Sequence, residues 1–114
     1  MERNVMSWNV AIENGYNPSL YSYNASNIPL GEYKARLDFK IWAKKVMGIS
    51  CYFVHEETGN KFQLTIYRQP ATKEYTLDSG GISFDDSPVG CMYQLKVTRN
   101  DKGRIIFEKA QVLE

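Results

Sequence analysis

The stretch YKARLDFKIWAK, from Tyr33 to Lys44, decides the expected fold. Apolar side chains take every second position of this stretch: Tyr33, Ala35, Leu37, Phe39, Ile41 and Ala43. The positions between them are mostly charged: Lys34, Arg36, Asp38, Lys40, Trp42 and Lys44. Because successive side chains of a strand point to opposite faces, this alternation predicts a long β-strand with one buried face, opened by Gly31.

Four further strands are expected downstream of this stretch. They cover residues 49–55, 61–68, 91–98 and 104–113, which are rich in β-branched and aromatic residues. The polar segments 56–60 and 99–103 each contain a glycine and predict hairpin turns. Residues 69–90 are interrupted by glycine and proline and show no strong amphipathic helix, so we expect an irregular crossover there.

The last expected strand has an ambiguous pattern. Its apolar residues fall on two faces, with Ile105 and Phe107 on one and Ile106, Ala110 and Val112 on the other. A bulge adds one residue to a strand and reverses the alternation beyond it. We therefore expect a bulge near Glu108 or Lys109.

Residues 1–30 differ in composition from the rest of the chain. Asparagine recurs, Pro18 and Pro29 interrupt regular structure, and residues 7–12 fit a short strand or one helical turn. The tyrosines of this segment are too apolar for a freely solvated tail. We expect residues 1–30 to form an arm that packs on the domain or on a partner, and residues 31–114 to form a single β-barrel domain.

This order of elements resembles the OB-fold, which has a long first strand, a hairpin, a crossover and a second hairpin. The resemblance covers residues 31–113 and lies in the pattern of strands. It implies an all-β, five-stranded antiparallel barrel that is partly open. Five strands cannot bury a two-sheet sandwich well, and closure removes exposed strand edges, so the same architecture is expected on packing grounds.

Composition narrows the functional classes. The net charge of +1 argues against nucleic-acid binding by bulk charge, but leaves room for a local basic face. Cys51 and Cys91 lie in apolar runs, which favours two reduced core thiols over a disulfide. No cofactor and no metal site are expected, since His55 is the only histidine and no CxxC spacing occurs. With no signal-like or membrane-spanning run, we expect a cytoplasmic protein that does not bind membranes.

A single-stranded nucleic-acid interface is the first functional hypothesis. The expected outward face of the first three strands interleaves aromatic with basic or polar side chains: Trp42, Tyr52, Tyr67, Lys34, Arg36, Lys40, Lys61 and Gln63. Aromatic rings stack on bases while Lys and Arg neutralise phosphates, and OB-fold barrels present such platforms on strands two and three. The alternative is that these aromatics receive the arm as a second small core.

The second hypothesis is a small protein-binding inhibitor or adaptor, of the kind that phages and mobile elements use against host proteins. Aromatic side chains anchor protein interfaces well, and the arm supplies Trp8, Tyr16, Tyr21 and Tyr23. An exposed edge strand also offers a route to a homodimer. An enzyme is not expected, because His55 beside Glu56 is the only acid–base pair suggested and no nucleophile accompanies it.

Overall fold

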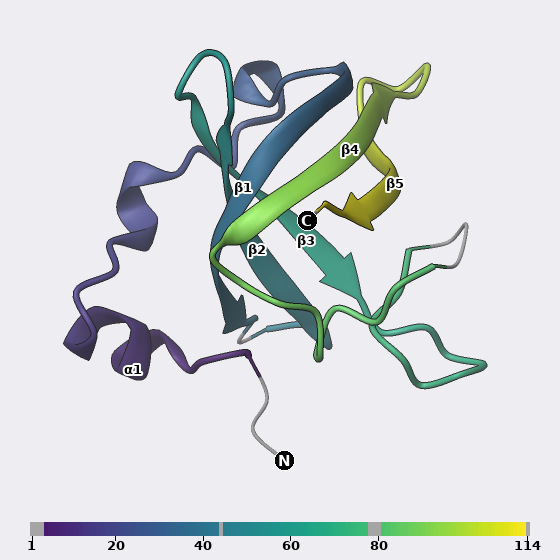
Figure 1. The fold of residues 1–114 in the computed structure, drawn as a ribbon. Coiled ribbons are helices and arrows are strands. Elements are labelled where there is room, and N and C mark those ends of the chain that lie inside the picture. The colour runs from purple at the N-terminus through teal and green to yellow at the C-terminus, as the bar shows by residue number, and fades with distance from the viewer. Residues whose placement is uncertain (1–3, 44, 78–80, 114) are drawn as a thin grey trace.

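The computed structural model describes residues 4–43, 45–77 and 81–113 (Figure 1). Its centre is one antiparallel five-stranded sheet in the order β3-β2-β1-β4-β5. The strands are β1 (Gly31–Trp42), β2 (Gly48–His55), β3 (Lys61–Tyr67), β4 (Cys91–Arg99) and β5 (Ile105–Val112). The predicted order of a long strand, a hairpin, a crossover and a second hairpin is confirmed.

The sheet curls around one apolar core to which all five strands contribute. Buried members include Leu37, Phe53, Phe62, Tyr93 and Leu95, and Phe107 of β5 packs against them. β3 and β5 are the two ends of the strand order and do not pair with each other. The fold is therefore an all-β, partly open barrel, as predicted, with its opening between β3 and β5.

A bulge at Asp38 divides β1 into two halves. Leu37 pairs with Phe53 and Phe39 pairs with Tyr52, so Asp38 is one residue too many in the ladder. Beyond such a bulge the side chains exchange faces. The side chain of Phe39 therefore points to the outer face and not into the barrel core, and the side chains of the following residues also point to the face opposite to the one expected.

This reversal overturns one sequence expectation. Uninterrupted alternation placed Lys40 and Trp42 on the outer face and Ile41 in the barrel core. In the structure Lys40 is fully buried, Trp42 packs against the barrel core, and Ile41 belongs to the outer cluster with Phe39.

A second bulge confirms the expectation for β5. Lys96 pairs with Lys109 and Val97 pairs with Phe107, which leaves Glu108 as the extra residue. The bulge brings four apolar side chains onto the core side of β5: Ile105, Phe107, Ala110 and Val112. Ile106 stays exposed.

The arm runs along the outer face of the β1–β3 end of the sheet, at the left of Figure 1. It contains the helix α1 (Trp8–Glu13) and two short 3-10 turns, η1 (Pro18–Leu20) and η2 (Ala25–Asn27). Polar residues cap these elements: Ser7 accepts a hydrogen bond from the Val10 N–H, and Asn17 and Asn24 cap the two turns. The recurrent asparagines thus have a local structural role.

Backbone bonds fasten the arm to the sheet at two places. Met6 forms a parallel bridge with Ile41, and Ser22 forms another with Phe62. Between them, the rings of Tyr21, Phe39 and Tyr52 form a second apolar cluster. No helix among the described residues is long and apolar enough to cross a membrane.

Three buried or half-buried tyrosines make the stability of the fold sensitive to alkaline pH. Burial raises the pKa of Tyr33 and Tyr93, and burial together with a hydrogen bond to Asp38 raises that of Tyr21. Above pH ~10 the unfolded chain releases these phenolic protons while the folded chain retains them. Stability should therefore be intact below pH ~10 and fall as the pH rises further. Thermal melts between pH 8 and 11.5 would show this as a falling Tm, and an unchanged Tm would contradict it.

Candidate functional site

Lys40 is a buried structural cation and not a surface ligand for phosphate. Its ammonium group donates to the carbonyl oxygens of Phe84 and Ser87, at 2.5 and 2.6 Å, and to the Ser87 hydroxyl at 3.0 Å. Burial lowers the pKa of Lys40, and the nearby carboxylates of Asp85 and Asp86 oppose that shift. Lys40 thus ties the crossover turn around residues 84–87 to β1.

Tyr52 and Trp42 do not form an open stacking platform. Tyr52 points to the outer face, as expected, but the arm covers it and leaves it 3% exposed. Its ring stacks on Phe39 at 4.5 Å and meets Tyr21 edge-on at 5.3 Å. Trp42 is half-buried and packs against Tyr75. For Tyr52 the alternative hypothesis is therefore correct: this outward aromatic residue packs against the arm in a second small core.

The other predicted nucleic-acid residues are accessible but dispersed. Lys34, Arg36, Lys61 and Tyr67 are exposed and Gln63 is half-buried. Arg36 is paired with Asp38 at 2.6 Å, and the Lys61 ammonium lies 5.6 Å from the centre of the Tyr21 ring. Tyr67 lies at the opposite end of β3 from Lys61. The eight predicted residues therefore do not share one exposed face.

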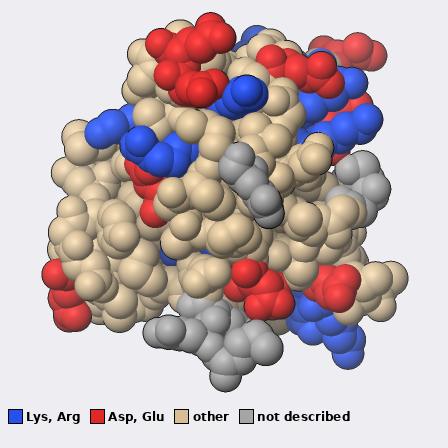
Figure 2. Space-filling model, in the orientation of Figure 1, with Lys and Arg blue, Asp and Glu red and all other residues tan. Residues whose placement is uncertain are grey.

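The arm instead exposes an apolar surface. We call this the arm surface; its large side chains are between 38% and 82% exposed and comprise Trp8, Val10, Ile12, Tyr16, Leu20 and Tyr23. Glu13 is the only charged residue between Asn4 and Leu30. The lower left of Figure 2, over the arm, is accordingly almost free of charged side chains. Of the four residues predicted to bind a partner, only Tyr21 is buried.

Tyr16 illustrates how the arm surface is held in place. One side of its ring stacks on Phe39 at 4.6 Å, while the residue remains 38% exposed. Phe39 in turn packs against Tyr52 of the sheet. The exposed aromatic side chain is therefore supported from below by rings that the barrel fixes.

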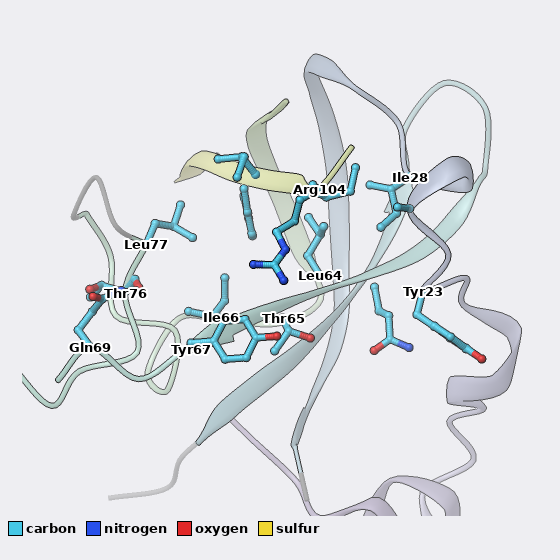
Figure 3. Close-up of a pocket in the computed structure, with 15 residues that line it drawn as sticks. Tyr23, Ile28, Leu64, Thr65, Ile66, Tyr67, Gln69, Thr76, Leu77 and Arg104 are labelled. Carbon is cyan, nitrogen blue, oxygen red and sulfur yellow. Dashed lines mark hydrogen bonds between the residues drawn. The ribbon is translucent and has the colours of Figure 1, made fainter. Parts of the chain in front are cut away.

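A second feature is a cavity of about 510 Å³ between the open edges of β3 and β5, which we call the seam groove. Its apolar floor includes Ile28, Leu64, Ile66, Leu77 and Phe107. Figure 3 shows Arg104 reaching between the strands, with Tyr23 to one side and Tyr67 to the other. A volume of this size lies in the range of ordinary ligand sites.

His55 has a structural role in the β2–β3 hairpin. Its ring stacks on Tyr33 at 4.8 Å, and its Nδ1 accepts from the backbone N–H groups of Glu57 and Thr58. These bonds hold the turn and leave only Nε2 unengaged by them. Within the described residues, no three His, Cys, Asp or Glu side chains come together as metal ligands do. Cys51 and Cys91 are both free thiols.

The sequence does not predict the seam groove. Arg104 immediately precedes β5, about forty positions after Thr65, and no local pattern connects the two. The hairpin signal at 99–103 marked a turn without indicating where the following side chain points. The arm aromatics did carry a signal, namely too many large apolar residues for a loop.

Comparison with known proteins leaves the chain without an assigned relative. No family model matches the sequence, and neither a curated protein nor a solved structure shows significant similarity to it. The OB-fold resemblance therefore stays a prediction.

Proposed function

We propose that this protein is a non-enzymatic binding protein that docks onto another protein through the arm surface, as a small inhibitor or adaptor. The observation that carries the proposal is the set of six large apolar side chains exposed on a segment with one charged residue. Interface centres are depleted in charge and enriched in aromatic residues. Large exposed apolar patches mark interaction sites on soluble proteins.

The composition of the arm supports the same conclusion. Tyr and Trp give large contact areas at a low cost in side-chain entropy, and Ser and Asn supply adaptable hydrogen bonds. Residues 4–30 contain six Asn, four Ser, three Tyr and one Trp. Because Tyr16 is braced by Phe39, part of this surface is organised before a partner arrives, which lowers the entropic cost of association.

Single-stranded nucleic acid is the second candidate. The observation that favours it is the pair of exposed rings, Tyr23 and Tyr67, that line the same cavity as Arg104. Base stacking on such rings contributes ~1–3 kcal/mol per base. The near-neutral total charge and the burial of Lys40 and Tyr52 weigh against it.

A matched pair of variants tests the proposed function. Leu20, on the arm surface, and Met47, in the β1–β2 connection, are 58% and 66% exposed. We expect affinity purification from cells that carry the gene to recover one enriched protein with the wild type and with Met47→Ser. Trp8→Ser combined with Leu20→Ser should weaken that complex about 30-fold or more, measured by calorimetry with the purified partner, because central apolar anchors contribute ~2 kcal/mol or more.

Salt dependence separates the two candidates. A protein complex anchored by apolar side chains should change little in affinity between 50 and 300 mM salt, whereas nucleic-acid binding falls steeply over a similar range. Quenching of tryptophan fluorescence by a dT oligonucleotide at low salt, reversed by added salt, would favour the second candidate. A partner that binds the double variant and the wild type equally well would refute docking through the arm surface.

A further inference from the structure

We propose that the seam groove binds an extended, acidic segment of a partner protein as an additional β-strand on the edge of β3. This site is distinct from the arm surface, with which it shares only Tyr23. Three features of the groove point to this occupant: the open backbone of β3, the apolar floor, and the Arg104 guanidinium, which pairs with none of the described carboxylates.

The edge of β3 already accepts an extended chain at one point. The Ser22 N–H donates to the Lys61 carbonyl at 3.0 Å, and the Ser22 carbonyl accepts from the Gln63 N–H at 2.9 Å. The arm then turns away into η2, so this pairing ends after a single residue. A strand edge of this kind is therefore competent to form a parallel ladder.

The alternation of backbone groups along β3 identifies which N–H and carbonyl groups on its outer edge have no strand partner among the described residues. Thr65 and Tyr67 share the orientation of Lys61 and Gln63, whose backbone groups point to the edge occupied by Ser22. No other described residue bonds to the N–H or carbonyl of Thr65 on that side. A strand lying ~4.8 Å from β3 would continue from the arm's contact with Gln63, pairing with the Gln63 carbonyl and then with Thr65 and Tyr67.

The floor of the groove specifies alternating side chains in such a strand. Side chains pointing inward would meet Leu64 and Ile66 from β3 and Ile105 and Phe107 from β5. Side chains pointing outward would pass between Tyr23 and Tyr67. The occupant is therefore an extended segment with apolar residues at every second position.

Arg104 adds the charge preference. Its backbone is held by reciprocal bonds with Asn100, so the base of the side chain is fixed. Its guanidinium reaches into the groove, and no described carboxylate lies within salt-bridge distance of it. An Asp or Glu side chain of the occupant would meet this guanidinium in a bidentate, charge-assisted pair.

Selection from a random library of linear twelve-residue peptides on the immobilised wild-type protein tests the proposal. We expect enrichment of peptides with alternating apolar residues and at least one Asp or Glu. Binding should fall about tenfold or more for Arg104→Glu and for Thr65→Pro, by loss of the ion pair and of one ladder bond. Lys102→Glu, a charge reversal in the same β4–β5 turn but outside the groove, should bind as the wild type does.

Thr65→Pro is chosen because its N–H points to the open edge, where proline is tolerated in strands. A second measurement does not depend on any variant. N-methylation of alternate residues of a selected peptide should abolish binding in one register and leave it intact in the other, as expected for a strand that pairs on one side.

Four results would overturn the inference. Peptides that bind Arg104→Glu and Thr65→Pro as well as the wild type would place binding outside the groove. Peptides lost only on Trp8→Ser with Leu20→Ser would support the arm surface and refute the groove. Binding of a dT oligonucleotide to the wild type that is lost in Arg104→Glu would assign the groove to nucleic acid. Lack of enrichment together with a dimer abolished by Thr65→Pro would assign it to a second copy of the chain.

Discussion

Replacing Lys40 by Met is expected to lower the free energy of unfolding by about 3–5 kcal/mol, because buried acceptors left without a donor cost ~1–3 kcal/mol each. The ammonium group serves the carbonyls of Phe84 and Ser87 and the Ser87 hydroxyl. Met has a similar shape but no donor. The three oxygens would lose their charged donor, keeping only a 3.1 Å bond from the Asn4 side chain to the Ser87 carbonyl and a 3.5 Å bond from the Ser87 hydroxyl to the Phe84 carbonyl. The turn at 84–87 would then be held less firmly to β1.

The control for this variant is Lys34→Met, which removes an exposed lysine from the same strand. We expect it to change stability by less than ~0.5 kcal/mol, as surface substitutions do. Urea unfolding of the two variants gives the comparison directly. Equal stabilities for Lys40→Met and Lys34→Met would show that the Lys40 contacts do not stabilise the fold.

Phe39→Ala is expected to cost about 3–5 kcal/mol, the usual range for removing a buried aromatic ring. Phe39 is 2% exposed and stacks against both Tyr16 of the arm and Tyr52 of β2. Its loss removes the centre of the cluster between the arm and the sheet. The arm should then open more often than the barrel does, since local unfolding follows the weakest contacts.

Limited proteolysis distinguishes this local effect from global unfolding. Cleavage within residues 14–24 of Phe39→Ala should be faster than cleavage in the sheet, while Tyr23→Ala, at a residue 82% exposed, should behave as the wild type does. Cleavage that is equally fast everywhere would mean that the arm and the barrel unfold as one unit.

The two bulges show how far the sequence predicts this fold. In β5 the apolar residues are out of step on the two sides of Glu108, so the bulge is visible in the pattern. In β1 the alternation continues through Asp38, and nothing local reveals the shift. Phe39 and Ile41 suit either face, because the arm provides an apolar cover on the outside.

Lys40 explains why the candidate site was harder to predict than the fold. A lysine in a strand is normally solvent-exposed. Here it is buried because two carbonyls and a hydroxyl more than forty residues later converge on it. Such a site depends on the position of the crossover in space. The periodicity of the strands carries no information about that position. The same holds for Arg104 and Thr65, which line one groove only because the sheet curls.

The arm precedes, in the order of synthesis, everything that it covers. Its docking partners Phe39, Tyr52 and Phe62 lie on three later strands. At about 5–20 residues per second, ribosomal elongation from Asn4 to Phe62 takes ~3–12 s. During that interval the aromatic residues of the arm have no sheet to cover and are available to chaperones. The arm, although synthesised first, can thus dock fully on the sheet only after β3 has emerged from the ribosome.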